Sequence, residues 1–354
     1  MSDQFLAPDD EELTPGISIR NLYKIFGPDA AKHVEKVKDG MTKAELNQKH
    51  RHSLGLRDIN TDLPAGKISV IMGLSGSGKS TLLRHLNGLI MPTAGEVLID
   101  GQDVAKMTPS ELRVFRRNKT AMVFQNFALL PHRTVMDNAI YGLDIQGIKR
   151  ADSIARARHW IERVGLKGYE DRYPSQLSGG MQQRVGLARA LTNDAPILLM
   201  DEAFSALDPL IRVDMQSVLL DIQKEVSKTI VFITHDLDEA LRLGDKIVIL
   251  RAGEVSQQGK GEEIVLHPAN DYVNAFVREV NRGRVIRLRS VLKPKPAERD
   301  WPQLQLPGNT TLEEAALLLL PAPESFATVL GRNGQPRGIV NMDDIMHGML
   351  VRSA

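Results

Sequence analysis

A glycine-rich turn between an apolar run and a helix-forming run constrains this chain more than any other feature of its sequence. Residues Gly73–Ser80 read G-x-x-x-x-G-K-S, and they follow the apolar run Ile68–Met72 and precede the helical pattern Thr81–Leu86. Glycines let successive backbone N–H groups turn toward phosphate oxygens, and the start of a helix adds about half a positive charge. In this strand–turn–helix setting the pattern predicts a cradle for a nucleoside triphosphate.

The residue types within the turn predict how a nucleotide would be held. The ammonium of Lys79 would reach the β- and γ-phosphates, and the hydroxyl of Ser80 would bind Mg²⁺. We expect phosphate contacts from the whole turn, namely Gly73, Leu74, Ser75, Gly76, Ser77, Gly78, Lys79, Ser80 and Thr81.

Two acids, Asp201 and Glu202, end a second apolar run, Ile197–Met200. A carboxylate at the carboxyl end of a buried parallel strand lies beside the ligand crevice of such a sheet. We expect Asp201 to hold Mg²⁺ through water and Glu202 to polarise the attacking water. Two acids after a strand are more often a solvated strand end, but the cradle upstream favours the catalytic interpretation.

Apolar runs that suit buried parallel strands recur along the chain, with helical patterns between several of them. They are Ile68–Met72, Thr120–Phe124, Ile197–Met200, Thr229–Thr234 and Lys246–Arg251. This alternation predicts a doubly wound α/β core of the P-loop NTPase class. The stretch Asp137–Tyr173 shows helical periodicity alone and predicts a helical subdomain inserted in that core.

The composition of the chain excludes several kinds of site and several classes of protein. The chain has 354 residues and no cysteine, which excludes disulfides and thiolate metal sites. Lys+Arg 45 against Asp+Glu 44 leaves no basic excess of the kind that dedicated nucleic-acid binders show. Apolar stretches fall short of the roughly 20 residues that span a bilayer, and the acidic Met1–Glu12 lacks the features of a secretory signal. We therefore expect a cytosolic protein whose membrane role, if any, needs another chain.

A second phosphate-receptive helix start lies at Leu177–Arg184, which reads LSGGMQQR. Ser178 suits an N-cap, and Gly179 and Gly180 permit close backbone approach. One nucleotide needs only one cradle, so this terminus suits a nucleotide held by another copy. With these residues the chain closely resembles the ATP-binding subunits of ABC transporters, whose signature is LSGGQ-like; Met181 stands where the family often has Gln.

The resemblance implies roles for further residues. Gln125 matches the glutamine that contacts Mg²⁺ and couples to the membrane subunit, so the implied metal ligands are Ser80, Gln125 and Asp201. Asp208 matches the segment that runs across the dimer, and His235 matches the switch histidine that senses the γ-phosphate. The implied catalytic residues are Lys79, Glu202 and His235. Phe26 is the expected adenine-stacking aromatic, with Tyr23 as its rival.

Other segments resemble one branch of the family, the importers of glycine betaine, proline and choline. They are the charged insert 27–55 and the motifs Phe127–His132, Asp201–Arg212 and Pro268–Val273. Those subunits often end in two CBS repeats, whereas Thr310–Leu350 resembles one. We expect that module to contain a helix over Thr311–Leu320, a hairpin of Phe326–Leu330 and Gly338–Val340, and a helix over Asp343–Leu350.

These observations predict a domain plan. Residues 1–16 form a mobile N-terminus, 17–281 an ABC ATPase domain with the exposed helical insert 27–55 and a helical subdomain 126–176, 282–300 a basic linker, and 301–354 a CBS-like module. The fold class is thus α/β, with an ABC ATPase core and a small C-terminal α+β module.

The resemblance also implies cofactors and partners. ATP and Mg²⁺ would lie in a homodimer, each nucleotide between Gly73–Thr81 of one copy and Ser178–Gly180 of the other. Integral-membrane permease subunits would bind near Phe127–Tyr141 at the cytoplasmic face of the inner membrane, a substrate-binding protein would act indirectly, and no nucleic acid is expected. The alternatives are a soluble ABC-type ATPase not engaged in transport and a nucleotide-binding regulatory module without turnover.

Overall fold

The computed structural model describes residues 14–205, 207–322, 324–331 and 333–350, which fall into two compact units. The first unit runs to Gln258 and the second begins at Gly259. Most of the N-terminal segment expected to be mobile, residues 1–13, lies outside the described residues. The prediction of a mobile segment is wrong for Pro15 and Gly16, because these residues begin strand β1 and Pro15 is paired with Pro64.

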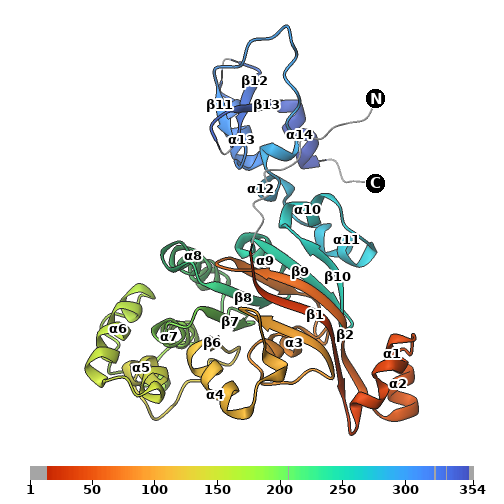
Figure 1. The fold of residues 1–354 in the computed structure, drawn as a ribbon. Coiled ribbons are helices and arrows are strands. Elements are labelled where there is room, and N and C mark those ends of the chain that lie inside the picture. Colours follow the sequence, from red (N-terminus) through yellow and green to blue (C-terminus); the bar gives the residue numbers. More distant parts are fainter. Residues whose placement is uncertain (1–13, 206, 323, 332, 351–354) are drawn as a thin grey trace. The chain divides into compact units, whose positions relative to one another are not determined.

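The first unit is built around a six-stranded sheet of order β10-β9-β3-β8-β7-β6 (Figure 1). Its strands are β3 (Ile68–Met72), β6 (Thr120–Val123), β7 (Ile197–Asp201), β8 (Thr229–Thr234), β9 (Lys246–Arg251) and β10 (Glu254–Gly259). Strands β9, β3, β8, β7 and β6 pair in parallel, and β3, β7 and β8 are buried along their whole length. The predicted α/β core is therefore confirmed, with each predicted strand within one residue of its observed bounds.

The parallel register aligns the carboxyl ends of four strands. Met72 of β3 lies opposite Thr234 of β8, Ile233 of β8 opposite Asp201 of β7, and Met200 of β7 opposite Val123 of β6. The loops after these strands therefore leave the sheet along one edge, where ligands bind in open α/β sheets.

Helices surround this sheet. They are α3 (Lys79–Leu86), α4 (Pro109–Asn118), α5 (Val135–Gln146), α6 (Arg150–Arg163), α7 (Gly179–Thr192), α8 (Pro209–Val226) and α9 (Leu237–Leu243). Helices α5, α6 and α7 gather beside β6, and α5 and α6 account for the helical subdomain expected over Asp137–Tyr173 (Figure 1). Among the helices that the structure describes, none is long and apolar enough to cross a membrane.

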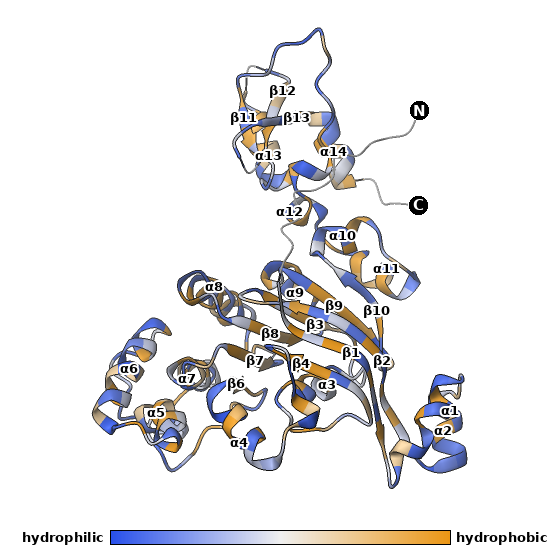
Figure 2. Ribbon diagram, in the orientation of Figure 1, coloured by the Kyte–Doolittle hydropathy of each residue, from blue (hydrophilic) through white to orange (hydrophobic). Residues whose placement is uncertain are grey.

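A second, antiparallel sheet of order β2-β1-β4-β5 completes the unit. Its strands are β1 (Pro15–Phe26), β2 (Ser53–Pro64), β4 (Ala94–Ile99) and β5 (Gln102–Asp103). One apolar cluster joins both sheets through α3, whose Leu82, Leu83 and Leu86 are fully buried within it. In Figure 2 the strands β7 and β8 are coloured mainly as hydrophobic, whereas helix α6 carries many hydrophilic residues.

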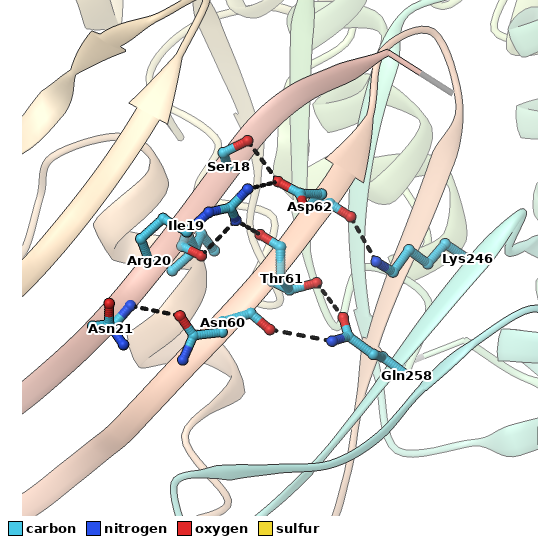
Figure 3. Close-up of polar contacts among 9 residues, drawn as sticks. All are labelled: Ser18, Ile19, Arg20, Asn21, Asn60, Thr61, Asp62, Lys246 and Gln258. Atoms are coloured by element: carbon cyan, nitrogen blue, oxygen red, sulfur yellow. Dashed lines mark hydrogen bonds and ion pairs between the residues drawn. The ribbon is translucent and has the colours of Figure 1, made fainter. Parts of the chain in front are cut away.

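A polar network ties the antiparallel sheet to the parallel one (Figure 3). Asp62 of β2 accepts hydrogen bonds from Ser18 and Arg20 of β1, each at 2.6 Å. Lys246 of β9 donates to the Asp62 carbonyl at 2.8 Å, and Gln258 accepts from the Thr61 hydroxyl at 2.6 Å. Burial lowers the pKa of Lys246. The network fixes the position of β2, and so of the loop that leads into it, against the central sheet.

The charged insert folds as two short helices, α1 (Val34–Lys38) and α2 (Lys43–His50). Thr42 and Glu45 form a capping box at the start of α2. The insert was expected to be an exposed helical segment, yet Val37 and Leu46 are fully buried in a small cluster with Tyr23. This satellite core explains why a segment so rich in charge keeps a defined fold.

The second unit contains a three-stranded sheet of order β11-β12-β13. Helices precede this sheet, lie between its strands and follow it along the chain. Its elements are α10 (Gly261–Leu266), α11 (Asp271–Val277), α12 (Arg282–Val285), β11 (Gln305–Pro307), α13 (Leu312–Leu319), β12 (Phe326–Leu330), β13 (Pro336–Asn341) and α14 (Met342–Leu350). The expected hairpin and both expected helices are present. The resemblance of this module to a CBS repeat remains a prediction.

The basic strip at 282–300 is not a simple linker. Arg282–Val285 forms α12, and Ile286 and Leu288 are fully buried. Glu262 of α10 accepts a hydrogen bond from the backbone N–H of Arg287 at 2.7 Å. Ile286 and Leu288, which lie between the arginines of the strip, pack in the second unit and hold this segment there. The many charges of the strip led to the prediction of a linker.

The buried His85 of α3 makes stability depend on pH. Its Nδ1 donates to the Thr81 carbonyl at 2.7 Å, and burial lowers the pKa of His85 to about 4. An unfolded chain with an ordinary histidine pKa binds the proton more readily, so folding stability from this group is complete above about pH 6.5 and falls as pH drops toward about 4, by about 3 kcal/mol.

Urea unfolding at a series of pH values tests this. A His85→Leu variant should lose that part of the acid sensitivity, whereas a variant of the exposed His132 (His132→Gln) should keep the wild-type slope. An identical slope in wild type and His85→Leu would contradict the assignment.

Candidate nucleotide-binding site

The turn after β3 has a backbone that only glycine allows at its key positions. Gly73 has φ 149° and Gly78 has φ 105°. A Cβ on Gly73 would lie 2.3 Å from the Leu250 carbonyl oxygen, and one on Gly78 would lie 2.8 Å from Leu56. The Gly253 N–H donates to the Ser77 carbonyl at 3.0 Å. The cradle is therefore held against the strand β9 and the loop after it.

Lys79 begins α3 and is only 5% exposed. Its ammonium donates to the carbonyls of Gly73 at 2.8 Å and Leu74 at 3.2 Å, and it lies 3.4 Å from a carboxylate oxygen of Glu202. A buried cation requires such partners, because desolvation without them is costly. Phosphate oxygens entering the turn could take the place of these weaker acceptors.

Ser80 and Asp201 form an oxygen pair at the same edge of the sheet. The Ser80 hydroxyl donates to Asp201 Oδ1 at 2.8 Å, and Asp201 is 7% exposed. Magnesium in nucleotide sites takes one or two protein oxygens and completes its shell with phosphates and water. A hydroxyl beside a carboxylate fits that requirement, since both are hard oxygen ligands.

Glu202 has φ 46°, a left-handed backbone that is uncommon for this residue type. Its Oε2 accepts from the Gln125 amide at 3.3 Å and lies 3.6 Å from His235 Nδ1, while its Oε1 faces Lys79. Lys79, Gln125 and His235, from three different segments, thus all lie next to the carboxylate of Glu202. The sequence predicted all four as site residues, and the structure brings them together.

The signature residues lie elsewhere in the unit. Ser178 caps α7 by accepting from the Met181 N–H at 3.3 Å, as expected. An ideal Cβ on Gly179 lies 3.9 Å from Phe127, and one on Gly180 lies 3.0 Å from Ile211. These three residues therefore pack near the loop after Gln125 and the start of α8, with Ser178 and Gly179 exposed.

Asp208 caps α8 and accepts from the Ile211 N–H at 3.1 Å. It belongs to the segment Ser205–Asp208, of which Ala206 lies outside the described residues. Asp208 is exposed and shows no part in the carboxylate cluster around Glu202.

The two aromatic candidates differ in access. Phe26 ends β1, is 41% exposed and has the Lys24 ammonium 5.1 Å from its ring centre. Tyr23 is 7% exposed and packs in the core of the charged insert. Only the ring of Phe26 offers a free face for stacking, which supports the expectation that it contacts a base.

Sequence reasoning missed the residues that support the cradle from behind. Gly55 and Gly253 crowd Gly78, and the Leu250 carbonyl crowds Gly73. These positions are distant in sequence and carry no functional side chain. The only available signal was the glycine at the turn after the apolar run Lys246–Arg251.

Comparisons with known proteins agree with this geometry. The sequence model of the family described as ABC transporter matches residues 56–205. The glycine betaine transport ATP-binding protein OpuAA of Bacillus subtilis is 52% identical over 277 residues, which are 78% of this chain and 66% of that relative. The glycine betaine/proline betaine transport system ATP-binding protein ProV of Salmonella typhimurium is 46% identical over 93% of this chain and 81% of its own length.

Two further proteins extend the comparison. The trimethylamine N-oxide transport system ATP-binding protein TmoW of Pelagibacter ubique is 43% identical and is aligned over 96% of this chain and 98% of its own length. Among solved structures, the dimeric bacterial ABC transporter cassette MJ0796 is similar, with a TM-score of 0.59, 33% identity, and coverage of 69% of this chain and 98% of that chain.

The cradle predicts the effect of removing its ammonium. Lys79→Ala should weaken binding of ATP by at least about 30-fold, because the lost group is a buried, hydrogen-bonded charge. Isothermal titration of the purified chain measures the affinity, and Lys106→Ala, a change at an exposed lysine, serves as control. Unchanged affinity in Lys79→Ala would remove the turn from the nucleotide site.

Proposed function

The chain belongs to the ATP-binding subunits of ABC transporters, and from this premise we propose that it hydrolyses ATP to power import of a quaternary amine or related compatible solute through a separate membrane permease. Several curated relatives are named for transport of glycine betaine, proline betaine or trimethylamine N-oxide. They align over most of this chain. The alignments with ProV and with TmoW of Pelagibacter ubique cover 93% and 96% of it, so they extend into its second unit. The proposed substrate class rests on that likeness.

The proposed ATPase activity rests on the contacts that Lys79, Gln125 and His235 make with Glu202. Transfer of a phosphoryl group to water needs positioning and charge neutralisation more than covalent chemistry. Lys79 neutralises charge on the phosphates, and Glu202 accepts a hydrogen bond from the attacking water and polarises it. His235, whose Nδ1 lies 3.6 Å from Glu202, would contact the γ-phosphate.

We propose that Ser80, Asp201 and Gln125 hold Mg²⁺, directly or through water. When bound, the ion neutralises charge that develops on the phosphate oxygens. The Ser80 hydroxyl and the Asp201 carboxylate already lie 2.8 Å apart at the edge of the cradle. Gln125 follows the end of β6, and its amide contacts Glu202, the residue after Asp201.

The working form is a homodimer with two ATP molecules in its interface. Ser178–Gly180 start α7, a helix of fourteen residues whose N-terminus favours an anion, yet they are not part of the cluster around Glu202. A second copy would bring this terminus to the γ-phosphate held by Gly73–Thr81 of the first. Asp208, exposed at the start of α8, would lie along the same interface. ATP then closes the dimer and hydrolysis opens it.

Opening and closing must reach the membrane subunits. We propose that Phe127–Tyr141 contacts the permease at the cytoplasmic face of the inner membrane, and that a substrate-binding protein delivers the solute to that permease. Met136 is buried in its own subdomain, whereas Leu129 and Leu130 are half-buried. The two leucines, rather than Met136, are therefore available as contacts. Phe26 would stack on the adenine.

Reconstitution tests the whole proposal. The chain is purified with the membrane protein that accompanies it and reconstituted in vesicles that enclose ATP on the side of the ATP-binding subunits, and uptake of labelled glycine betaine into these vesicles is measured. Uptake should require ATP and should fall at least about 100-fold in Glu202→Gln, which removes the polarising carboxylate. The exposed Glu254→Gln serves as the matched control. ATP hydrolysis without uptake of any quaternary amine would contradict the transport role.

A further inference from the structure

The loop that follows Gln125 has an unusual backbone. Phe127 has φ 58° and Ala128 has φ 46°, so two successive residues with side chains adopt the left-handed conformation. Residues other than glycine rarely adopt it, and such conformations persist only when surrounding contacts enforce them. Some group must therefore hold this pair of residues in place.

That group is the guanidinium of Arg189 on α7. Its Nη1 donates to the Ala128 carbonyl at 2.6 Å and its Nη2 donates to the Phe127 carbonyl at 3.0 Å. The planar fork of a guanidinium suits two acceptors side by side, which an ammonium cannot match. Burial lowers the pKa of Arg189, so the side chain carries its charge into a poorly solvated place and needs both carbonyls.

The far end of the loop is fixed independently. Asn138 of α5 accepts from the Leu130 N–H at 2.8 Å and donates to the Leu130 carbonyl at 3.1 Å. The near end is the last residue of β6, Val123, which is paired with β7. Between these two anchors, the two bonds from Arg189 restrain the turn that carries Gln125.

We infer that Arg189 is a positioning residue for ATP hydrolysis, which holds Phe127 and Ala128 left-handed so that Gln125 keeps its amide 3.3 Å from Glu202. This inference rests on the proposed ATPase function. Arg189 lies on the same helix that starts with Ser178–Gly180. Any movement of that helix therefore moves the two carbonyls that Arg189 holds, and with them Gln125. The signature terminus and the catalytic carboxylate are linked through one side chain.

A rescue experiment separates positioning from simple structural support. Arg189→Met removes both hydrogen bonds but keeps an unbranched apolar chain in place of the aliphatic part of the arginine. Ala128→Gly makes the left-handed conformation intrinsically accessible, so the loop needs less restraint. If Arg189 acts by holding this backbone, the glycine should compensate for the lost guanidinium, which it could not do for a general loss of packing.

The measurement is ATP hydrolysis by the purified full-length chain, with kcat and KM determined separately. Arg189→Met should lower kcat about tenfold while KM for ATP stays within about twofold, because the cradle is untouched. Ala128→Gly alone serves as the reference for the double variant, whose kcat should recover to within about threefold of that reference. Arg189→Lys, which keeps the charge but not the fork, should fall between wild type and Arg189→Met.

Arg116→Met is the matched control, since Arg116 on α4 is half-buried and donates to one backbone carbonyl, that of Gly88, at 3.2 Å. It should keep the wild-type kcat. A thermal melt of each variant reports folding, and if Arg189→Met does not fold, the Arg189→Lys and Arg189→Lys/Ala128→Gly pair provides the same comparison.

Wild-type kcat in Arg189→Met, or no recovery in the double variant, would overturn the role of Arg189 while leaving the proposed function in place. Failure of the wild-type chain to hydrolyse ATP would overturn both. A kcat loss that recovers with Ala128→Gly supports the inference.

Discussion

The buried ammonium of Lys79 is the interaction on which the site depends. It joins the phosphate cradle, through the carbonyls of Gly73 and Leu74, to the carboxylate of Glu202. A cation this deeply buried must be matched by acceptors, and a triphosphate would supply stronger ones than two carbonyls. Binding of the nucleotide would thus free Glu202 from part of its present environment. Nucleotide binding would therefore also prepare the carboxylate of Glu202 for its proposed role in hydrolysis.

Strand register is what brings these groups within reach. Because β3, β8, β7 and β6 pair in parallel, the residues that follow them leave the sheet at one edge. The apolar, fully buried strands make that register costly to shift, since a slip of one residue would turn the strands' side chains over. The site also relies on elements behind it, above all the Leu250 carbonyl and Gly253, which pack against the turn. The rigid sheet and the segments packed against the turn therefore fix the positions of the loops that carry the site residues.

The sequence predicted the parts of this molecule that local pattern determines. The strands of the parallel sheet and the hairpin Phe326–Leu330 with Pro336–Asn341 follow from short apolar runs between turns, and the site residues follow from motifs. Strands β2, β4 and β5 were not foreseen, because their residues mix charge with apolar side chains and become strands only by pairing, β2 and β4 with β1 and β5 with β4. The basic strip after Asn281 was misjudged for a related reason, as Ile286 and Leu288 matter only once their tertiary contacts exist. The role of Arg189 could not be predicted from the sequence either. It depends on the backbone angles of Phe127 and Ala128, which lie 62 and 61 residues before Arg189 in the chain.

In the proposed dimer two copies of this chain enclose each ATP, and mixing two inactive variants is the sharpest test of that arrangement. Lys79→Ala lacks the cradle's ammonium, and Ser178→Arg places a bulky side chain at the start of α7. In a mixed dimer one interface combines both defects, and the other combines an intact cradle with an intact helix start. ATP hydrolysis should therefore appear on mixing, although each variant alone is inactive. If mixing restores no hydrolysis while the two variants are shown to associate, the nucleotide is not shared between copies in the way proposed.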